Sequence, residues 1–310
     1  MATKQRRLNM RGMQILSMPN KIDHSPVWHA RRKTGIGGSE SAAVLGVSKW
    51  RTAYQVWLDK TGQAEPTEPN EAMRTGTILE KSIREMYSNE TGRTVYDPGF
   101  KVDEEYPFIV GDVDGLCDDR VLEIKNSGYE WGEIPVDYFF QVQHYMRLHN
   151  KELADIAVLF HGQVFRIYTI ERQDDLWKDI LPIYEEFWRC VQSLTPPELT
   201  NLEDVNQAYR VSQETSVTLS DSAIQALDKI KAIRASIAEQ EQTLSTLEFE
   251  IKRELGENAT GLDASGRTLV TWKTTKPRET FDTKRFKTDN PSLYEQYRTT
   301  GNPSRPFLVK

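Results

Sequence analysis

Cysteine is scarce in this sequence, and long apolar runs are absent from it. Its 310 residues include two cysteines, Cys117 and Cys190, which excludes a disulfide framework, a four-cysteine zinc site and a cysteine-bound iron–sulfur cluster. The longest apolar run, residues 156–160, is far shorter than the roughly 20 residues that cross a bilayer. No apolar stretch follows the basic N-terminus, as it would in a secretory signal. The sequence therefore predicts a soluble protein of a reducing cytoplasm, with no membrane partner.

Positive charge is also scarce overall, but it is unevenly distributed. The formal net charge is −6 and the pI is about 5.6, values that argue against a nucleic-acid-binding domain. However, residues 1–60 hold 11 Lys and Arg against 3 Asp and Glu, and residues 262–310 hold 10 against 5. The two ends therefore carry +8 and +5, and the middle carries −19. An average over the whole chain hides two basic ends that suit contact with DNA.

The rest of the composition is that of a folded chain with mixed secondary structure. Hydrophobic residues make up 38% of it and aromatic residues 10%, enough to build a core. Periodicity and turn residues predict helices at 39–46 (opened by Ser39), 52–60, 71–90, 137–150 and 174–194, and strands at 93–102, 107–117, 120–126, 155–160 and 163–170. Strands mixed with flanking helices, rather than strictly alternating βα units, predict an α/β or α+β domain.

The chain divides by composition into four predicted segments. These are a flexible basic arm at 1–24, a folded core at 25–198, a connection and long helix at 199–260, and a small basic segment at 261–310. Within the predicted helix at 220–256, the a and d heptad positions are occupied by Ile230, Ile233, Ile237, Gln240, Leu244, Leu247 and Ile251. Because only Gln240 among these is polar, this helix needs a partner along one seam. A helical hairpin within the chain and an oligomeric coiled coil both satisfy that need.

Acidic residues at alternating positions mark a candidate metal site. The segment 111–125 reads GDVDGLCDDRVLEIK. A tight turn at Asp118–Asp119 would place Asp114 opposite Glu123 on adjacent strands, and Asp112 opposite Lys125. Facing carboxylates repel unless a cation lies between them, and Mg²⁺ prefers one or two carboxylates plus water. An ordinary hairpin with a solvated acidic edge is the alternative.

Two further side chains on helices extend this candidate site. Glu80 shares a helical face with Ile83 and Tyr87, where a carboxylate is costly unless it meets a metal or a partner. An ion pair with Arg84, one turn later, is the alternative for Glu80. Gly76 is interpreted as allowing close approach of another backbone. Gln141 and Gln143 on a later helix can hold water or phosphate oxygens.

The chain resembles a known family of nucleases in four motifs. In chain order they are Trp28-His29-x-x-Arg32 with Gly35-Ile36-Gly37-Gly38-Ser39-Glu40, Gly76-Thr77-x-x-Glu80 with Tyr87 and Thr91-Gly92, Asp114-Gly115 with Glu123-Ile124-Lys125, and Gln141-Val142-Gln143. They look like the PD-(D/E)xK nuclease core, and specifically like phage recombination exonucleases of the YqaJ and lambda-exonuclease type. The resemblance covers about residues 27–195, and Val113 stands where the motif name has proline.

This resemblance implies a fold, a reaction and roles for particular residues. The fold is a restriction-endonuclease-like central mixed sheet flanked by helices, here with a C-terminal helical extension. The reaction is metal-dependent hydrolysis of duplex DNA, processively 5′→3′ from an end. The implied ligands of Mg²⁺ (with Mn²⁺ as a substitute) are Asp114, Glu123, the Ile124 carbonyl and Glu80. Lys125 is implied to orient and activate water, with Gln141 in support. Arg32 and Ser39 are implied to surround a 5′-phosphate. A helix N-terminus at Ser39 would independently attract phosphate.

The resemblance also implies partners and a setting. It implies duplex DNA ends as substrate, a single-strand annealing protein of the RecT type, and a homo-oligomeric ring, often a trimer, in the bacterial host cytosol, encoded by a phage or prophage. Lys284, Arg285 and Lys287, interleaved with aromatic residues, suit a further DNA contact, with a solvated basic tail as the alternative. An endonuclease or nickase on the same core, and an inactive DNA-binding scaffold using the long helix and tail, are alternative functions. A glycosidase carboxylate pair would not require Lys125.

Overall fold

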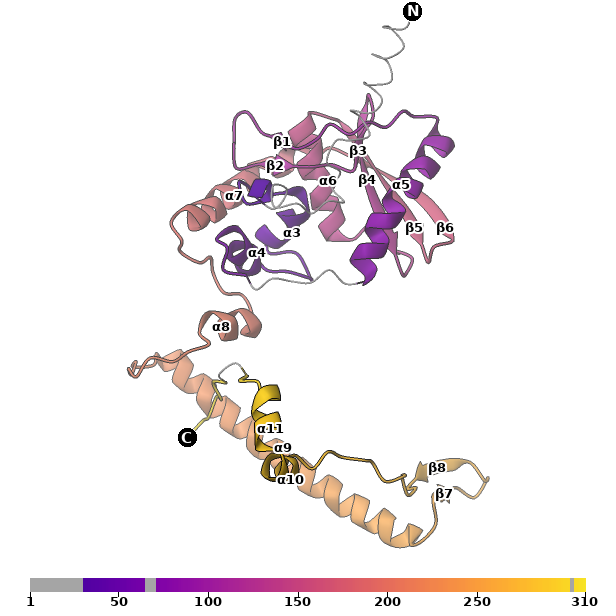
Figure 1. Ribbon diagram of the computed structural model, residues 1–310, viewed down its shortest axis with the longest axis vertical. Coiled ribbons are helices and arrows are strands. Elements are labelled where there is room, and N and C mark those ends of the chain that lie inside the picture. The colour runs from indigo at the N-terminus through magenta and orange to yellow at the C-terminus, as the bar shows by residue number, and fades with distance from the viewer. Residues whose placement is uncertain (1–29, 65–70, 302–303) are drawn as a thin grey trace, which may run out of the picture. The chain divides into compact units, whose positions relative to one another are not determined.

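The computed structural model describes residues 30–64, 71–301 and 304–310 (Figure 1). The predicted arm at 1–24 and the motif residues Trp28 and His29 lie outside the described residues. The chain divides into two compact units, one ending at Gln207 and the other beginning at Ala208. The predicted core ended at residue 198, and the first unit ends nine residues later, at Gln207. The finer division into segments stays a prediction.

A four-stranded mixed sheet forms the centre of the first unit. Its strands are β3 (Gly115–Leu116), β4 (Arg120–Ser127), β5 (Leu153–Phe160) and β6 (Val164–Glu171), in that order across the sheet. The pair β4–β5 is parallel, whereas β3–β4 and β5–β6 are antiparallel. A parallel pair needs a crossover connection, and α6 (Val136–His149) supplies it between β4 and β5. The predicted central mixed sheet is confirmed.

Helices cover both faces of this sheet (Figure 1). On one face, Val142 and Met146 of α6 pack in a buried cluster with Val121 of β4. On the other face, Ile83 of α5 (Glu71–Thr91) packs in a cluster with Leu122. Successive residues of β4 therefore point to opposite faces, as the alternation of a strand requires. This arrangement sends the side chains of Glu123 and Lys125 toward the α6 side, the face on which Val121 packs.

The remaining elements of the first unit are short except for one helix. They are η2 (Gly38–Glu40), α3 (Ser41–Val44), α4 (Ala53–Lys60), β1 (Lys101–Val102), β2 (Val110–Gly111), η3 (Asp174–Leu176), α7 (Trp177–Gln192) and α8 (Leu202–Ala208). The prediction that Ser39 opens a helix over 39–46 is wrong in detail. A 3₁₀ turn begins one residue earlier, because the Glu40 carboxylate accepts a hydrogen bond from the Gly37 N–H and makes Gly37 the cap.

The two predicted strands before β4 are shorter than expected. Residues 93–102 contribute β1 and one isolated bridge at Tyr96, and residues 107–117 divide into β2 and β3. The second break has a clear cause. Asp114 Oδ2 accepts the Ile124 N–H at 2.7 Å, in the place where the next rung of the β3–β4 ladder would form.

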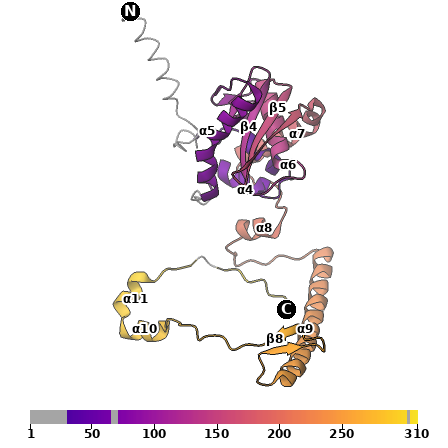
Figure 2. The same cartoon turned by 90° about the vertical axis from the view of Figure 1, so that its right-hand side faces the viewer.

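The second unit contains one long helix and several small elements (Figure 2). The elements are α9 (Asp221–Leu255), β7 (Thr260–Leu262), β8 (Thr268–Thr271), α10 (Thr283–Asp289) and α11 (Pro291–Tyr297). The long helix predicted at 220–256 is confirmed. Ser220 caps it, because its hydroxyl accepts the N–H of Ala223. Within the described parts of both units, no helix has the length and apolar character needed to cross a bilayer.

Candidate active site

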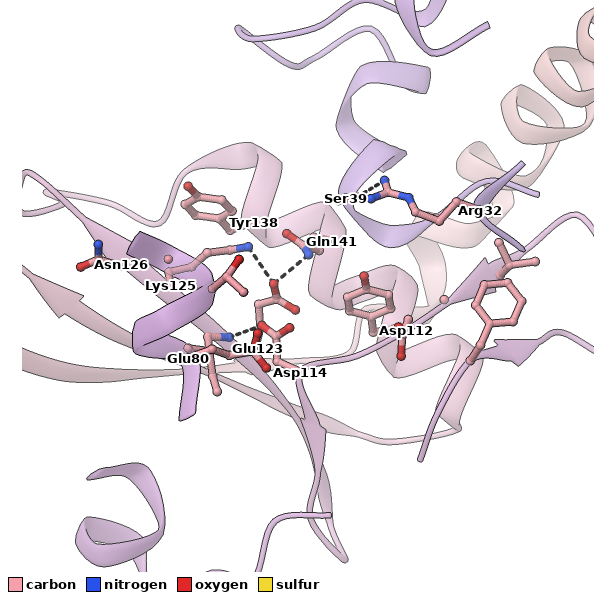
Figure 3. A pocket seen from close by; sticks show the side chains of 18 of the residues that line it. Arg32, Ser39, Glu80, Asp112, Asp114, Glu123, Lys125, Asn126, Tyr138 and Gln141 are labelled. Carbon is pink, nitrogen blue, oxygen red and sulfur yellow. Dashed lines mark hydrogen bonds and ion pairs between the residues drawn. The ribbon is translucent and has the colours of Figure 1, made fainter. Parts of the chain in front are cut away.

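A cleft of about 550 Å³ opens at one edge of the mixed sheet in the first unit (Figure 3). All eight residues that the sequence assigned to catalysis, metal binding and the 5′-phosphate line it: Arg32, Ser39, Glu80, Asp114, Glu123, Ile124, Lys125 and Gln141. They come from five separate segments of the chain, which the sheet and the helices α5 and α6 bring together. Their grouping in one cleft is a result of the fold, since they are spread over more than a hundred residues of sequence.

Glu123 accepts hydrogen bonds from two other side chains of the cleft. Its Oε1 accepts hydrogen bonds from Lys125 Nζ at 2.7 Å and from Gln141 Nε2 at 2.8 Å (Figure 3). The side chain is 3% exposed, so its charge lies out of bulk water and depends on these donors. The observed pairs Gly115–Leu122 and Leu116–Val121 have the predicted register. That register brings Asp114 beside Glu123 at the end of β3.

Lys125 is held in the cleft as a cation. Burial by itself would lower its pKa, but the carboxylates of Glu123 and Asp114 raise the pKa above its ordinary value. Its ammonium group also lies 4.7 Å from the centre of the Tyr138 ring, a distance that suits a cation–π contact. In this geometry Lys125 donates hydrogen bonds and supplies positive charge.

Glu80 lines the cleft and also forms the ion pair that the sequence offered as the alternative to a metal site. Its Oε1 lies 2.8 Å from Arg84 Nη2, at i,i+4 spacing. The same Nη2 donates to the backbone carbonyl of Asp114 at 2.6 Å. Arg84 therefore connects the α5 carboxylate to the strand segment that carries Asp114. The prediction for Gly76 is not supported, because a Cβ on that residue would meet no described residue within 4 Å.

The oxygen atoms of the cleft fit a hard divalent cation. Carboxylates of Asp114 and Glu123 lie beside the Ile124 segment, with Glu80 on the same cleft. Among the residues that the structure describes, no three His, Cys, Asp or Glu side chains are close enough to hold a metal ion by themselves. Mg²⁺, however, keeps several waters and takes only one or two protein carboxylates. The donor set fits Mg²⁺ in that form, in which Asp114 and Glu123 would be the two carboxylates.

Arg32 and Ser39 form a second, cationic part of the cleft. Arg32 Nη2 donates to Ser39 Oγ at 3.1 Å and to Glu40 Oε1 at 3.3 Å. Glu40 is buried and forms an ion pair with Lys60 Nζ at 2.6 Å. Burial alone would raise the pKa of Glu40, but Lys60 and Arg32 lower it to about 2. The Arg32 side chain is 35% exposed, so it presents a guanidinium group at this corner of the cleft, which suits a phosphate.

Several residues of the site were not assigned a role from the sequence. Asn126, Tyr138 and Tyr145 line the cleft without having been selected, and Asp112, which the sequence placed opposite Lys125, lines it without an assigned role. No local sequence pattern predicts the ion pair of Lys60 with Glu40, because the two residues belong to separate helical segments. Arg84 did carry a signal, its i+4 spacing from Glu80, but that spacing was interpreted as an alternative to a functional role.

Two groups of residues singled out in the sequence are not among the residues that line the cleft. Gln143 points elsewhere, since its Nε2 donates to the Glu171 carbonyl at 2.8 Å and its Oε1 accepts the Gln173 N–H. It ties α6 to the end of β6. The basic residues of the tail, Lys284, Arg285 and Lys287, all belong to α10 of the second unit. Their contact with DNA stays a prediction.

Known proteins resemble this chain in sequence and in structure. The YqaJ-like viral recombinase domain matches residues 27–152. Over 287 residues the chain is 31% identical to the uncharacterized protein YqaJ of Bacillus subtilis, covering 87% of this chain and 89% of that protein. An alkaline exonuclease of Laribacter hongkongensis superposes with a TM-score of 0.48 at 23% identity, over 55% of this chain and 94% of that one. A phage-related exonuclease of Haemophilus somnus gives a TM-score of 0.44 at 15% identity, over 52% and 94%.

Proposed function

This chain belongs to the family of YqaJ-like viral recombinase proteins, and we propose that it is a Mg²⁺-dependent exonuclease that digests duplex DNA from an end in the 5′→3′ direction. One observation carries the proposal. Glu123 and Lys125 lie on one strand with their side chains in hydrogen-bond contact, beside Asp114 and facing one cleft. Hydrolysis of a phosphodiester needs oxygen ligands for a metal and a cation for the developing charge, and this arrangement offers both.

Asp114, Glu123 and the Ile124 carbonyl would hold the metal ion, with Glu80 at a second position. When bound, Mg²⁺ supplies positive charge against the phosphate oxygens and lowers the pKa of a bound water. Gln141 supports the site by donating a hydrogen bond to Glu123. That bond fixes the orientation of the carboxylate, as ligand-orienting hydrogen bonds do around metals in general.

Lys125 has the charge needed to act on the attacking water and the phosphate. Because the neighbouring carboxylates raise its pKa, it is a hydrogen-bond donor at neutral pH and not a general base. It can orient the water and stabilise the negative charge that builds on the phosphate oxygens. Arg32 and Ser39, at the cationic corner of the same cleft, would bind the terminal 5′-phosphate.

A time course on end-labelled linear duplex DNA tests the proposed reaction. We expect digestion with Mg²⁺, weaker or altered digestion with Mn²⁺, and none after chelation of divalent cations. Glu123→Ala and Lys125→Ala should each abolish digestion. Asp175→Ala removes an exposed carboxylate that is not among the residues lining the cleft, and it should leave the rate unchanged. Digestion at the wild-type rate by both cleft variants would exclude this site.

The form of the products separates an exonuclease from an endonuclease. An exonuclease leaves covalently closed circular duplex intact and releases mononucleotides from linear duplex. Labels placed separately on the 5′ and 3′ ends show the direction, since the label at the attacked end is lost first. Nicking of the closed circle would instead support an endonuclease or nickase on the same core.

The biological setting is part of the same proposal. An exonuclease of this kind leaves single-stranded tails, which a RecT-type annealing protein would pair during recombination of a phage or prophage in the host cytosol. A ring of identical subunits around the duplex would give processive digestion. Adding excess unlabelled duplex after digestion starts tests processivity. A processive enzyme finishes the molecules it has begun, whereas a distributive one stops releasing label.

A further inference from the structure

The apolar seam of α9 faces solvent along most of its length. Exposed side chains at its a and d positions are Ile233, Ile237, Leu244, Leu247 and Ile251, each between 48% and 59% exposed. The helix has 35 residues, so an apolar stripe of about four heptads, interrupted at Gln240, lies open. Large apolar side chains in one stripe indicate an interaction surface. In the described part of the second unit, nothing covers this stripe.

The charges beside the seam are separated along the helix. Lys229 occupies a g position and Arg234 an e position, both in the N-terminal half. Glu241 at e and Glu250 at g lie in the C-terminal half. All four side chains are exposed. A seam bordered by positive charge at one end and negative charge at the other is complementary to a second copy of itself, if that copy runs in the opposite direction.

We propose that α9 forms an antiparallel coiled coil with α9 of a second copy of this chain. In that orientation g positions face g positions and e positions face e positions. Lys229 then lies opposite Glu250 of the second copy, and Arg234 opposite Glu241. By the twofold symmetry each pair occurs twice. The layers of the seam are Ile230 with Leu247, Ile233 with Leu244 and Ile237 with Gln240, again each twice.

The same charges disfavour the other arrangements. In a parallel pair, a g residue faces the e residue of the following heptad, which would place Lys229 against Arg234 of the second copy. An antiparallel pair shifted by one heptad, with Ile237 opposite Leu247, would place Arg234 opposite Glu248. It would also bring the two Glu241 side chains face to face and leave Lys229 and Glu250 without each other. Like charges across a seam are destabilising. The charge pattern therefore selects both the direction and the register of the pair.

The mass of the full-length protein in solution tests the pairing. We expect Arg234→Glu to halve the mass, measured by sedimentation or light scattering over a range of concentrations, because it places Glu against Glu at two positions. The double variant Arg234→Glu/Glu241→Arg exchanges the partners and should restore the wild-type mass. Lys231→Glu makes the same charge change at a b position away from the seam, and it should leave the mass unchanged.

Three outcomes of this measurement would overturn the proposal. They are a wild-type protein that is monomeric at all concentrations, an Arg234→Glu variant with unchanged mass, and an Arg234→Glu variant that associates more tightly. The last is the result expected of a parallel pair, where the introduced carboxylate would meet Lys229 of the second copy. If the first unit also self-associates, Arg234→Glu should still lower the mass by a factor of two. Association through the first unit and association through α9 can therefore be distinguished.

Engineered cysteines test the direction independently of charge. In a Cys190→Ser background, a chain that carries both Ile233→Cys and Leu244→Cys should give a disulfide-linked dimer under mild oxidation, because position 233 of one copy faces position 244 of the other. Neither single variant should give one, because identical positions are far apart in an antiparallel pair. Efficient cross-linking of Ile233→Cys alone would show a parallel pair and contradict the proposal. Neither experiment depends on nuclease activity, so the pairing can fail while the proposed function stands.

Discussion

Lys60 Nζ lies 2.6 Å from Glu40 Oε2, and the side chains of both residues are less than 5% exposed. The same ammonium group donates to the backbone carbonyl of Arg32 at 2.5 Å. Because Glu40 also accepts a hydrogen bond from the Arg32 side chain, Arg32 is held at its backbone and at its guanidinium group. A buried ion pair thus fixes the cation at the phosphate corner of the cleft.

Removing Lys60 should destabilise the fold strongly. Lys60→Met keeps most of the buried volume but leaves the Glu40 charge with Arg32 as its remaining cation, and breaking a buried pair in this way costs about 3 kcal/mol or more. Urea unfolding measures the loss. Lys60→Met/Glu40→Gln removes both charges and should recover part of it. A Lys60→Met protein within about 1 kcal/mol of wild type would show that the pair contributes little.

Arg32→Ala should change the choice of DNA end more than the chemistry. Without the guanidinium group, the proposed pocket loses its charge-assisted bonds to a terminal phosphate, so digestion of 5′-phosphorylated ends should slow by roughly tenfold or more. Ends treated with phosphatase should be digested as slowly by wild type as by the variant. If the wild-type enzyme does not distinguish the two kinds of end, Arg32 and Ser39 do not form a 5′-phosphate pocket.

Local periodicity was sufficient to predict most of the helices and the longer strands, and the family resemblance supplied the central mixed sheet. The helices α4, α5, α6 and α9, and the hairpin of β5 and β6, follow from patterns within a few residues of each element. The short strands before β4 were overestimated because their ends depend on tertiary contacts, such as the bond from the Ile124 N–H to Asp114. Strand propensity carries no information about a side chain that replaces a backbone hydrogen bond between two strands.

The site was predictable where its residues share one strand or one helix. Glu123 and Lys125 alternate on a strand, and the register with Asp114 follows from a short turn. Glu40 and Lys60 were not predictable as a pair, because their contact is made by two helical segments that meet only in the folded chain. The motifs gave the order of the site residues, and tertiary packing decides which other charges stabilise them.

Arg84→Met should lower nuclease activity without unfolding the protein. Arg84 contacts both the Glu80 carboxylate and the Asp114 carbonyl, so its loss loosens two proposed metal ligands. Losing such an orienting contact around a metal typically costs about 10- to 100-fold. The half-saturating Mg²⁺ concentration should rise, which a role limited to folding would not produce. Lys81→Met, which removes an exposed cation from the same helix, is the control and should have no effect.

His144 should make the stability of the first unit depend on pH. Its Nε2 lies 2.9 Å from the Val110 carbonyl, which can only accept, so this nitrogen carries the proton and Nδ1 accepts from the Tyr184 hydroxyl at 3.2 Å. Burial lowers the pKa of His144 to about 4. The unfolded chain therefore binds a proton below about pH 6.5 that the folded chain does not, and stability falls as the pH drops from about 6.5 toward 4.

At pH 5 this difference amounts to about 2 kcal/mol relative to pH 7. Urea unfolding of wild type at the two pH values measures it, and His144→Gln should show a smaller loss between them. His161→Gln removes an exposed histidine and should keep the wild-type loss. Equal losses in wild type and His144→Gln would contradict the assignment. Nuclear magnetic resonance titration of the wild-type protein gives the same test without a substitution, because the His144 ring should still be neutral at pH 5.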